Sequence, residues 1–364
     1  MTRAVTIKDV ARLAGCGIAT VSRVLNETGP ASADTREKVL KAARTLQFQF
    51  SDIGRSLQSS TTRTIGCVVP SLANPVFADA VQGLQDVLQR AGYQLLLACS
   101  NYDSDQETKA IQTLLTKQVD GLVLTVSDAA SSEGLQIVRQ RDIPCCLMFN
   151  EAVDHVPSAS IDNFAAAKMV ADAFAEAGHQ ETGFLALRFK TSDRARRRFE
   201  GFADACERHG MSPPALLQID EDDGDLSALL SRLLSENTKL SGLFASNDFL
   251  ALAAINAARS LGRNVPQDLS VVGFDGIALG QMVQPSLATV ESNPNLMGSD
   301  AAQIVLSAVN AQAMPSPQDP RSSFRFRPGD SLAPWRSKTR GHGGVVTSPP
   351  PNHEKSKLNS TRNS

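Results

Sequence analysis

The sequence predicts a small all-α domain at the N-terminus, followed by an α/β core of two lobes with parallel sheets covered by helices. Three observations support this prediction. Residues 6–46 carry apolar side chains at helical spacing in three short runs. Residues 61–290 alternate apolar strand-like runs with amphipathic helices, and one order of elements occurs twice among them. The chain of 364 residues is long enough for two or three domains.

Residues 6–26 have the pattern of a helix-turn-helix. Thr6 is a suitable N-cap for the first apolar run, Gly15 breaks that run, and a second helix is expected from about Gly17. The polar face of the second helix offers small or hydrogen-bonding side chains and one long cation, namely Ile18, Ala19, Thr20, Ser22, Arg23 and Asn26. Such a face suits a recognition helix in a DNA major groove.

A third helix is expected from Ser32 and completes a small domain. Its predicted inner side consists of Ala33, Val39, Leu40, Ala43 and Leu46. A helical hairpin that only packs is the alternative to a DNA-reading unit. The length of the pattern and the polar face of the second helix favour the DNA-reading unit.

The core is predicted to consist of two copies of one lobe. Its strands are expected at residues 64–69, 94–99, 121–126, 143–149, 182–187, 215–219, 242–245 and 269–274. The same order of helices, strands and an acidic loop fills residues 65–128 and 182–248, with Gly83 and Gly201 at matching places. A ligand site is expected in the cleft between the lobes, because open parallel sheets bind ligands beyond the carboxyl ends of their strands.

The formal charge of −2 conceals an asymmetry along the chain. Residues 1–60 hold nine Lys and Arg against five Asp and Glu, residues 61–330 hold 21 against 32, and residues 331–364 hold six against one. A basic head on an acidic body favours contact with DNA phosphates through the head and discourages it elsewhere in the core.

Several other classes of protein are not supported. The six cysteines show no C-x-x-C spacing and the five histidines are scattered, so no metal site, disulfide scaffold or cofactor is expected. The chain has no Walker A loop, no G-x-S-x-G elbow and no complete G-x-G-x-x-G, which argues against an enzyme. It shows no signal peptide and no apolar run long enough to span a bilayer, so a cytoplasmic protein without a membrane partner is expected.

Motifs along most of the chain resemble those of the lactose/galactose repressor (LacI/GalR) family. They include Thr6-Ile-Lys-Asp-Val-Ala, Ala19-Thr-Val-Ser-Arg-Val-Leu-Asn26, Val119-Asp-Gly-Leu122, Asn247-Asp248 and Val272-Gly-Phe-Asp275. Their order and spacing cover about residues 5–330. The resemblance implies a two-lobed core similar to periplasmic sugar-binding proteins, and a DNA-binding transcription regulator of the repressor type controlled by a small effector.

The resemblance also implies which residues contact operator DNA. They are Thr6, Gly17, Ile18, Ala19, Thr20, Ser22, Arg23, Asn26 and Leu57. Arg23 is the candidate for a bidentate contact to guanine, and Leu57 matches a linker leucine that enters the minor groove. The linker departs from the family pattern, because Gly54 replaces an alanine and costs the linker helix about 0.5 to 1 kcal/mol.

Seven residues are expected to bind the effector between the lobes. They are Asn74, Phe77, Asp162, Arg188, Arg198, Asn247 and Asp275. Most are suggested by their position just after a predicted strand, and the resemblance selects Arg198 within the basic run at residues 194–198. In that run Arg196 or Arg197 would be a solvated surface residue.

The expected effector is a sugar acid such as gluconate. Residues 280–290 resemble the gluconate-repressor branch of the family, and Leu226 stands where many sugar-responsive members carry an aromatic residue. Arg188 and Arg198 are suited to a ligand carboxylate. A neutral sugar, or a nucleoside or purine, is the alternative.

The expected domain limits follow from these patterns. They are a helix-turn-helix domain at residues 1–50, a hinge at 51–61, a two-lobed core at 62–330 and a disordered tail at 331–364. The first lobe is expected to take about residues 62–161 and 292–320, and the second about 162–291 and the final strand. The tail has no leucine heptad, so a homodimer on pseudo-palindromic, double-stranded operator DNA is expected. A solute-binding protein is the more remote alternative.

Overall fold

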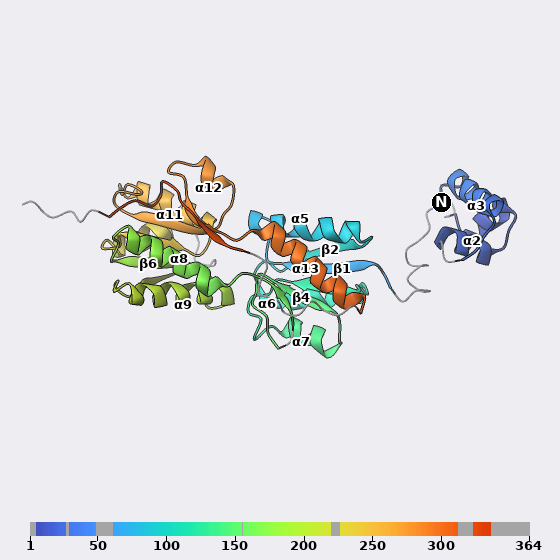
Figure 1. Cartoon of the computed structure of the whole chain (residues 1–364), viewed down its shortest axis with the longest axis horizontal. Coiled ribbons are helices and arrows are strands. Elements are labelled where there is room, and N and C mark those ends of the chain that lie inside the picture. Colours follow the sequence, from blue (N-terminus) through green and yellow to red (C-terminus); the bar gives the residue numbers. More distant parts are fainter. Residues whose placement is uncertain are drawn as a thin grey trace, which may run out of the picture.

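The computed structural model describes residues 5–26, 29–48, 61–154, 156–219, 226–311 and 323–335. It has a head of three helices and a core of two α/β lobes (Figure 1), which confirms the predicted fold class. No helix among these residues is both long and apolar enough to cross a membrane.

The head is a bundle of three short helices. They are α1 (Ile7–Ala14), α2 (Ile18–Asn26) and α3 (Ala33–Thr45). The Asp9 carboxylate accepts hydrogen bonds from the backbone N–H (3.0 Å) and the hydroxyl (2.6 Å) of Thr6, and Gly15 ends α1 at a φ of +65°. The buried core of the bundle consists mainly of Val10, Ala11, Val21, Val24, Val39, Ala42 and Ala43.

The inner side of α3 is narrower than predicted. Val39 and Ala43 are buried, whereas Ala33 and Leu40 are exposed. The helix contacts α1 and α2 along one stripe only, and Leu40 lies about 100° around the helix axis from Val39. Leu13 on α1, which is 53% exposed, points away from the bundle for the same geometric reason.

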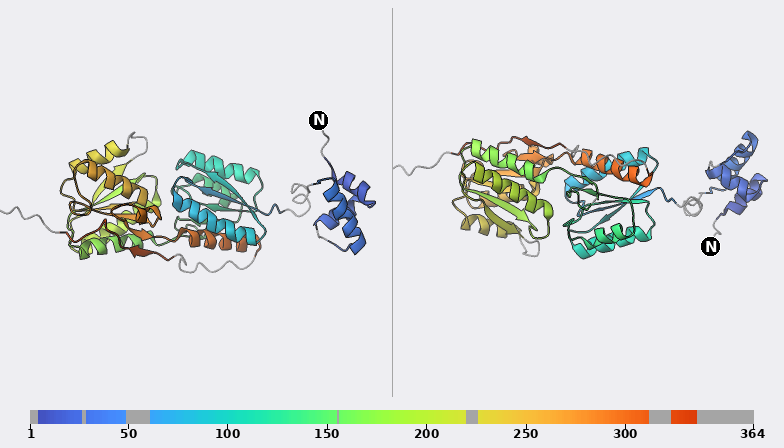
Figure 2. Two further views of the ribbon diagram at one scale, coloured as in Figure 1. Left: turned by 90° about the horizontal axis from the view of Figure 1, so that it is seen from above. Right: turned by 60° about the horizontal axis from the view of Figure 1, so that its bottom comes forward.

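The first lobe is a parallel sheet with helices on both faces (Figure 2). The sheet has the order β2-β1-β3-β4-β5 and consists of β1 (Thr64–Val69), β2 (Gln94–Cys99), β3 (Gly121–Leu124), β4 (Cys145–Met148) and β5 (Ser158–Ala159). One face is covered by α5 (Pro75–Arg90) and α13 (Pro294–Val309), and the other by α6 (Ser104–Thr116) and α7 (Glu133–Gln140). All β1 residues after Thr64 are buried, as expected for a central parallel strand.

The second lobe repeats this plan with one more strand. Its sheet has the order β11-β10-β9-β8-β6-β7 and consists of β6 (Thr182–Leu187), β7 (Ala215–Ile219), β8 (Gly242–Ala245), β9 (Ser270–Asp275), β10 (Ala288–Glu291) and β11 (Arg325–Arg327). All pairs are parallel except β10 with β11. The covering helices are α8 (Asn163–Glu176) with α9 (Asp193–Arg208), and α10 (Leu226–Glu236) with α11 (Asp248–Ser260); α12 (Leu279–Met282) is a single turn.

The predicted strand limits agree with β1, β2, β6, β7 and β8. β3 and β4 are shorter than predicted, and β9 is shifted by one residue toward the C-terminus. β5 and β10 lie outside the predicted ranges, and β11 is the final strand expected in the second lobe.

The repeated glycines mark a close helix contact in each lobe. A Cβ atom on Gly83 of α5 would lie 2.0 Å from the carbonyl oxygen of Asn295 on α13. A Cβ atom on Gly201 of α9 would lie 2.1 Å from the carbonyl oxygen of Phe164 on α8. Only glycine permits this backbone approach, so the sequence repeat corresponds to one packing solution used twice.

The first residues of the predicted disordered tail are instead part of the second lobe. Ser331 is fully buried and donates a hydrogen bond to the carbonyl of Val271 (2.6 Å). The Trp335 N–H donates to the carbonyl of Ala177 (2.7 Å), and its ring centroid lies 5.7 Å from that of His179. Residues 331–335 are fixed because they complete the hydrogen bonding at the end of the second sheet. The remainder of the predicted tail, residues 336–364, lies outside the described residues.

Candidate functional site

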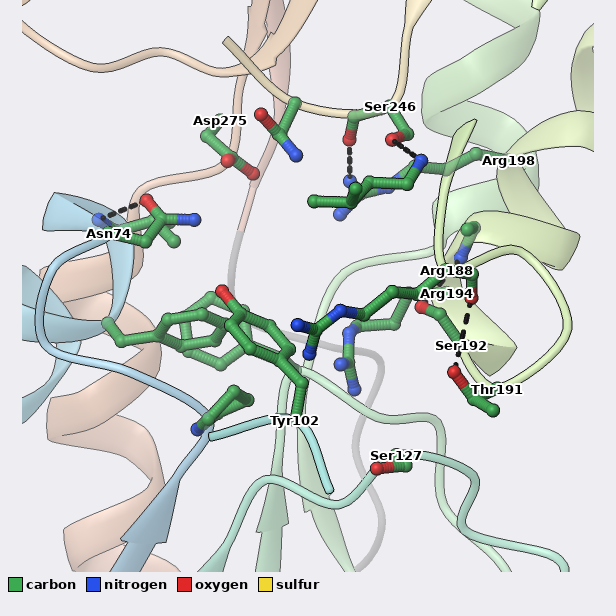
Figure 3. A pocket seen from close by; sticks show the side chains of 17 residues that line it. Asn74, Tyr102, Ser127, Arg188, Thr191, Ser192, Arg194, Arg198, Ser246 and Asp275 are labelled. Atoms are coloured by element: carbon green, nitrogen blue, oxygen red, sulfur yellow. Dashed lines mark hydrogen bonds between the residues drawn. The ribbon is translucent and has the colours of Figure 1, made fainter. Parts of the chain in front are cut away.

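A pocket lies between the two lobes at the carboxyl ends of their strands (Figure 3). It is open to solvent, and the space within it together with its mouth is about 750 Å³. The first lobe lines it with Pro70, Asn74, Val76, Phe77, Tyr102, Ser127 and Phe149. The second lobe lines it with Leu187, Arg188, Thr191, Ser192, Arg194, Ala195, Arg198, Ser246, Asn247 and Asp275.

Two asparagines are held at the pocket by helix capping. Asn74 caps α5 by accepting a hydrogen bond from the Val76 N–H (3.2 Å), and Asn247 caps α11 by accepting from the Leu250 N–H (2.8 Å). Each cap uses the side-chain oxygen. The side-chain NH₂ group of Asn247 therefore remains as a donor for a ligand, whereas the Asn74 side chain also hydrogen-bonds the Tyr102 hydroxyl.

Arg198 is a buried cation that reaches the pocket from α9. Its Nε donates to Oδ1 of Asn163 (2.9 Å) and its Nη1 donates to the carbonyl of Ser246 (2.6 Å). The guanidinium carbon lies 3.5 Å from the centroid of the Phe274 ring. Burial lowers the pKa of Arg198 to about 10, so the group is still charged at neutral pH. Its Nη2 makes no hydrogen bond to any described residue, which leaves it for a ligand.

Asp275 is the only carboxylate among the described residues that line the pocket. It ends β9 at a φ of +110°, a backbone conformation that residues other than glycine rarely adopt. Burial raises the pKa of Asp275 to about 7, although the nearby charge of Arg198 acts in the opposite direction. A carboxylate beside a guanidinium can bind neighbouring hydroxyls of a sugar from both sides.

Asp248 supports the turn that carries Asp275. Its buried carboxylate accepts hydrogen bonds from the N–H groups of Gly276 (2.9 Å) and Ile277 (2.8 Å) and from the hydroxyl of Thr289 (2.6 Å). These three bonds hold the backbone immediately after Asp275. Asp248 is therefore a positioning residue for the pocket carboxylate.

The first lobe forms an aromatic wall opposite these charges. Phe77 packs edge-on against Phe149, with ring centroids 5.1 Å apart, and against Tyr102 at 6.3 Å. The guanidinium carbon of Arg188 lies 4.3 Å from the Tyr102 centroid, and its Nη1 donates to the carbonyl of Asn101 (3.3 Å). Arg188 therefore connects the second lobe to the first across the pocket.

The arginines of α9 differ in their surroundings. Arg194 lines the pocket and donates through Nη1 to the carbonyl of Val126 in the first lobe (2.9 Å). Arg196 pairs with Asp128 (2.5 Å), outside the set of lining residues. Arg197 pairs with Glu151 (3.3 Å) and Glu200 (2.8 Å). The two middle arginines are therefore neutralised by carboxylates on the protein surface.

Six of the seven predicted effector residues come together in the pocket. They are Asn74, Phe77, Arg188, Arg198, Asn247 and Asp275. Asp162 does not line the pocket, so the prediction for this residue is corrected. The residue is exposed, and its carboxylate caps α8 by accepting a hydrogen bond from the Ala165 N–H (2.9 Å). Its neighbour Asn163 contributes to the pocket instead, by fixing Arg198.

Tyr102 and Arg194 line the pocket but were not among the predicted site residues. Tyr102 follows β2, so the rule of position after a strand could have found it. Arg194 belongs to the basic run, in which no local signal separates it from Arg196. Across the residues that the structure describes, no cluster of three His, Cys, Asp or Glu side chains is suited to a metal ion.

Most of the predicted DNA-reading residues lie on α2 or directly before it. Ile18, Ala19 and Arg23 of α2 are exposed, with Ile18 at 45%, and Gly17 precedes them as the residue whose carbonyl accepts the first helical bonds. Thr20 and Ser22 are half-buried, Asn26 ends α2, and Thr6 takes part in the cap of α1. Leu57 and the rest of the predicted hinge up to residue 60 lie outside the described residues.

Comparisons with known proteins match both parts of the chain. The family model "Periplasmic binding proteins and sugar binding domain of LacI family" matches residues 62–326, and the model "Bacterial regulatory proteins, lacI family" matches residues 6–50. The ribose operon repressor of Halalkalibacterium halodurans is 32% identical over 309 residues, which are 85% of this chain and 92% of that protein.

Two further proteins extend the comparison. The HTH-type transcriptional repressor PurR of Haemophilus influenzae (strain PittEE) is 31% identical over 84% of this chain and 91% of its own. The crystal structure of the Lac repressor dimer bound to operator and the anti-inducer ONPF has the same fold, with a TM-score of 0.78 at 23% identity over 91% of this chain and 100% of that one. Given the family models and these relatives, the chain belongs to the LacI family of bacterial regulatory proteins.

Proposed function

We propose that this protein is a transcriptional repressor that binds pseudo-palindromic operator DNA as a homodimer and is controlled by a sugar acid bound between its lobes. One observation carries the proposal. A single chain combines a helix-turn-helix whose second helix exposes Arg23 with an interlobe pocket into which a buried cation, Arg198, directs a free donor. A DNA-binding domain joined to a ligand-binding core is the domain organisation of an effector-controlled regulator.

The head supplies the DNA contacts. Arg23 is suited to guanine through its planar pair of donors, while the exposed Ile18 and Ala19 can touch thymine methyl groups. Thr20 and Ser22 are suited to phosphates. Two heads related by a two-fold axis read two half-sites, and Leu57 of each hinge enters the minor groove between them.

The pocket favours an anionic ligand. Among the lining residues three guanidiniums, those of Arg188, Arg194 and Arg198, face one carboxylate, that of Asp275. Arg198 offers one unoccupied terminal nitrogen, which suits a hydroxyl, so the carboxylate of a sugar acid such as gluconate belongs beside Arg188 and Arg194. A neutral sugar is the alternative, because Phe77 and Phe149 also offer an apolar ring surface and one relative is a ribose operon repressor. A nucleoside or purine would use the same surface.

Ligand binding is transmitted to the head through the position of the lobes. The effector contacts both lobes, so it binds their closed arrangement more tightly than an open one. The free energy by which the effector changes DNA binding cannot exceed the difference between its binding free energies for the closed and the open arrangement. The two hinges of the dimer change their spacing as the lobes close.

Selection of duplexes by the full-length protein tests the DNA-binding part. A palindrome recovered from random duplexes is expected to bind with strong salt dependence in a gel shift. Arg23→Ala is expected to weaken that complex by about 1 to 3 kcal/mol and to relax the base preference at one position of each half-site. Arg208→Ala, an exposed arginine at the end of α9, is the matched control and should leave binding unchanged. Failure to prefer any palindrome contradicts the proposal.

A thermal-shift panel tests the effector. Gluconate, glucose, ribose, guanosine and hypoxanthine are compared on the full chain, and a ligand at one hundred times its Kd is expected to add about 2.7 kcal/mol of stability. Stabilisation by gluconate alone supports a sugar acid. Stabilisation by ribose or by hypoxanthine instead assigns the pocket to one of the alternatives.

A further inference from the structure

We infer that Asp120 is a positioning residue for DNA binding, because its carboxylate fixes the point and the direction in which the hinge joins the core. The inference rests on the proposed function, in which the hinge transmits the state of the pocket to the head. Asp120 belongs to the motif Val119-Asp-Gly-Leu122 and does not line the pocket.

The Asp120 carboxylate binds the two residues that precede Thr64, the first residue of β1. Oδ1 accepts hydrogen bonds from the backbone N–H (2.8 Å) and the hydroxyl (2.9 Å) of Thr62, and Oδ2 accepts from the backbone N–H of Arg63 (2.7 Å). Two successive backbone N–H groups that converge on one carboxylate form an anion-binding turn, and the charge strengthens each bond. The predicted hinge ends at residue 61, so these bonds hold the first residues after it.

The backbone at Arg63 bends in a way that depends on such a partner. Its φ is +49°, in the left-handed region that residues other than glycine, asparagine and aspartate seldom adopt. The neighbouring strands hold the chain at the same place, since the Arg63 carbonyl accepts from the Gln94 N–H (2.8 Å) and the Thr64 carbonyl accepts from the Asp120 N–H (2.8 Å). The bend at Arg63 sets the direction in which the chain enters β1, and the Asp120 side chain holds the bend.

This anchor lies at the opposite end of the first sheet from the pocket. Asp120, Arg63 and Gln94 stand at the amino ends of β3, β1 and β2, whereas the pocket lies at the carboxyl ends of the strands. The six residues of β1 separate the two ends by about 20 Å. In Figure 1, β1 enters the first lobe at the end remote from the second lobe. A change at Asp120 should therefore affect the hinge without altering ligand contacts.

A fixed starting point makes the hinge move together with the first lobe. Without the carboxylate, the N–H groups of Thr62 and Arg63 would bond water, and Arg63 could adopt an ordinary extended conformation. The hinge would then leave the core in several directions. The head would lose pre-organisation for its operator, and the joint would absorb part of the movement that accompanies closure of the lobes.

Asp120→Ala in the full-length protein tests the anchor. We expect its affinity for the selected operator duplex to fall about 10-fold without ligand, and its affinity for a scrambled duplex to change by less than about 2-fold, because the head is unaltered. Calorimetry with gluconate as the probe should give a Kd within about 2-fold of the wild type, since the pocket is remote. The gluconate-dependent change in operator affinity should fall to less than about one third of the wild-type ratio.

Asp268→Ala is the matched control. Asp268 is also a half-buried carboxylate that precedes a strand, β9, and it accepts a hydrogen bond from the N–H of Asn264 (2.9 Å), but it belongs to the second lobe. The variant should lose stability as Asp120→Ala does, yet keep operator affinity and the gluconate response within about 2-fold of the wild type. This separates a general loss of stability from a change at the hinge.

A rescue experiment tests whether the bend is what the carboxylate holds. Asparagine adopts the left-handed conformation more readily than arginine does, so Arg63→Asn favours the bend without help from Asp120. The double variant Asp120→Ala/Arg63→Asn is expected to bind the operator within about 3-fold of Arg63→Asn alone.

The inference is overturned if Asp120→Ala and Asp268→Ala bind the operator equally well, or if Arg63→Asn restores no affinity in the Asp120→Ala protein. Failures of the proposed function look different. If gluconate does not alter operator binding by the wild type, only the proposed effector is wrong, because the loss of operator affinity is measured without ligand. If the wild type prefers no palindrome, the proposed function fails and this inference fails with it.

Discussion

The two lobes share one architecture but contribute different chemistry to the pocket between them. Every permanently charged residue in its lining comes from the second lobe, and every aromatic residue comes from the first. The lobes are matched at the level of single positions. Gly83 and Gly201 make the same close helix contact, and the N-caps Asn74 and Ser192 are separated by the same 118 residues as the two glycines.

This register shows how one supersecondary unit acquired two roles. In each lobe, the first strand is followed by a helix, α5 in the first lobe and α9 in the second. The third residue of this helix is Phe77 in the first lobe and Ala195 in the second. At the second residue, Val76 corresponds to Arg194. The buried Ala80 of α5 occupies the place that Arg198 holds on α9. The backbone therefore fixes where side chains meet a ligand, and the residue type at each place decides whether the lobe selects shape or charge.

Replacing Arg198 by alanine makes the second lobe resemble the first and should have the largest effect. The change removes the free Nη2 donor and leaves Oδ1 of Asn163 and the carbonyl of Ser246 without their buried donor. We expect effector affinity to fall by about 100-fold or more, which is about 3 kcal/mol. Calorimetry with the tightest ligand of the panel measures the change.

Arg197→Ala is the matched control for this prediction. Arg197 is adjacent on the same helix, but it is 42% exposed and pairs with Glu151 and Glu200. Exposed ion pairs contribute about 0 to 1 kcal/mol, so affinity should change by less than about 5-fold. Similar losses in the two variants would contradict a special role for the buried charge.

The titration of Asp275, which belongs to the charged second lobe, makes the stability of the protein depend on pH. Because burial raises its pKa to about 7, the folded protein holds a proton between roughly pH 4 and pH 7 that the unfolded chain has released. The free energy of unfolding therefore falls as pH rises through this window. Asp248, whose pKa burial raises to about 6, contributes with the same sign, while the charges of Arg198 and Arg194 oppose the shift at Asp275.

Asp275→Asn should reduce this slope and weaken ligand binding. Chemical denaturation between pH 4 and pH 8 is expected to show a smaller loss of stability for the variant than for the wild type. At pH 8, where the wild-type carboxylate is ionised and accepts hydrogen bonds from ligand hydroxyls, we expect the variant to bind about 10-fold more weakly. At pH 5.5 the difference should be smaller. A variant with the wild-type pH slope would show that another group titrates.

Phe77→Leu tests the contribution of the first lobe and should have a smaller effect. The substitution removes two edge-on ring contacts, with Phe149 and Tyr102, each of which contributes about 0.5 to 1.5 kcal/mol to stability. It also reduces the aromatic surface that Phe77 offers to a ligand in the pocket. We expect affinity to fall about 3- to 10-fold for charged and neutral ligands alike, because no charge is altered. Phe184→Leu removes a similar contact with Phe244 away from the pocket, so it should lower stability but not affinity.

Local sequence signals account for most of the fold. The limits of β1 and β6 follow from apolar runs with turn residues at both ends. β3 ends before its apolar run does, because the N–H of Val126 donates to the side chain of Asn150 rather than to a neighbouring strand. β5 and β11, with two and three residues, are too short for alternation along a strand to be visible.

The pocket could be predicted where residue type and position after a strand gave the same answer. Asp275 met both criteria, while Arg198 also required the resemblance to a known family. Asp162 follows no predicted strand and was indicated by the resemblance alone. A carboxylate just before a helix is equally suited to capping, and only the folded chain distinguishes the two roles. Arg194 and Arg196 have the same local sequence signals, and the direction that each faces depends on the packing of α9 against the first lobe.

The smallest expected effect concerns a contact in which both lobes contribute a charge. Arg196 and Asp128 form an ion pair across the lobes, with side chains 31% and 25% exposed. A double-mutant cycle with Arg196→Gln and Asp128→Asn should give a coupling energy of about 0.5 to 1 kcal/mol in ligand binding, because partly exposed pairs are screened by solvent. The coupling should decrease in 0.5 M salt. Since this contact lies outside the pocket lining, any effect on affinity must act through the closed arrangement of the lobes, and it should be equal for all ligands.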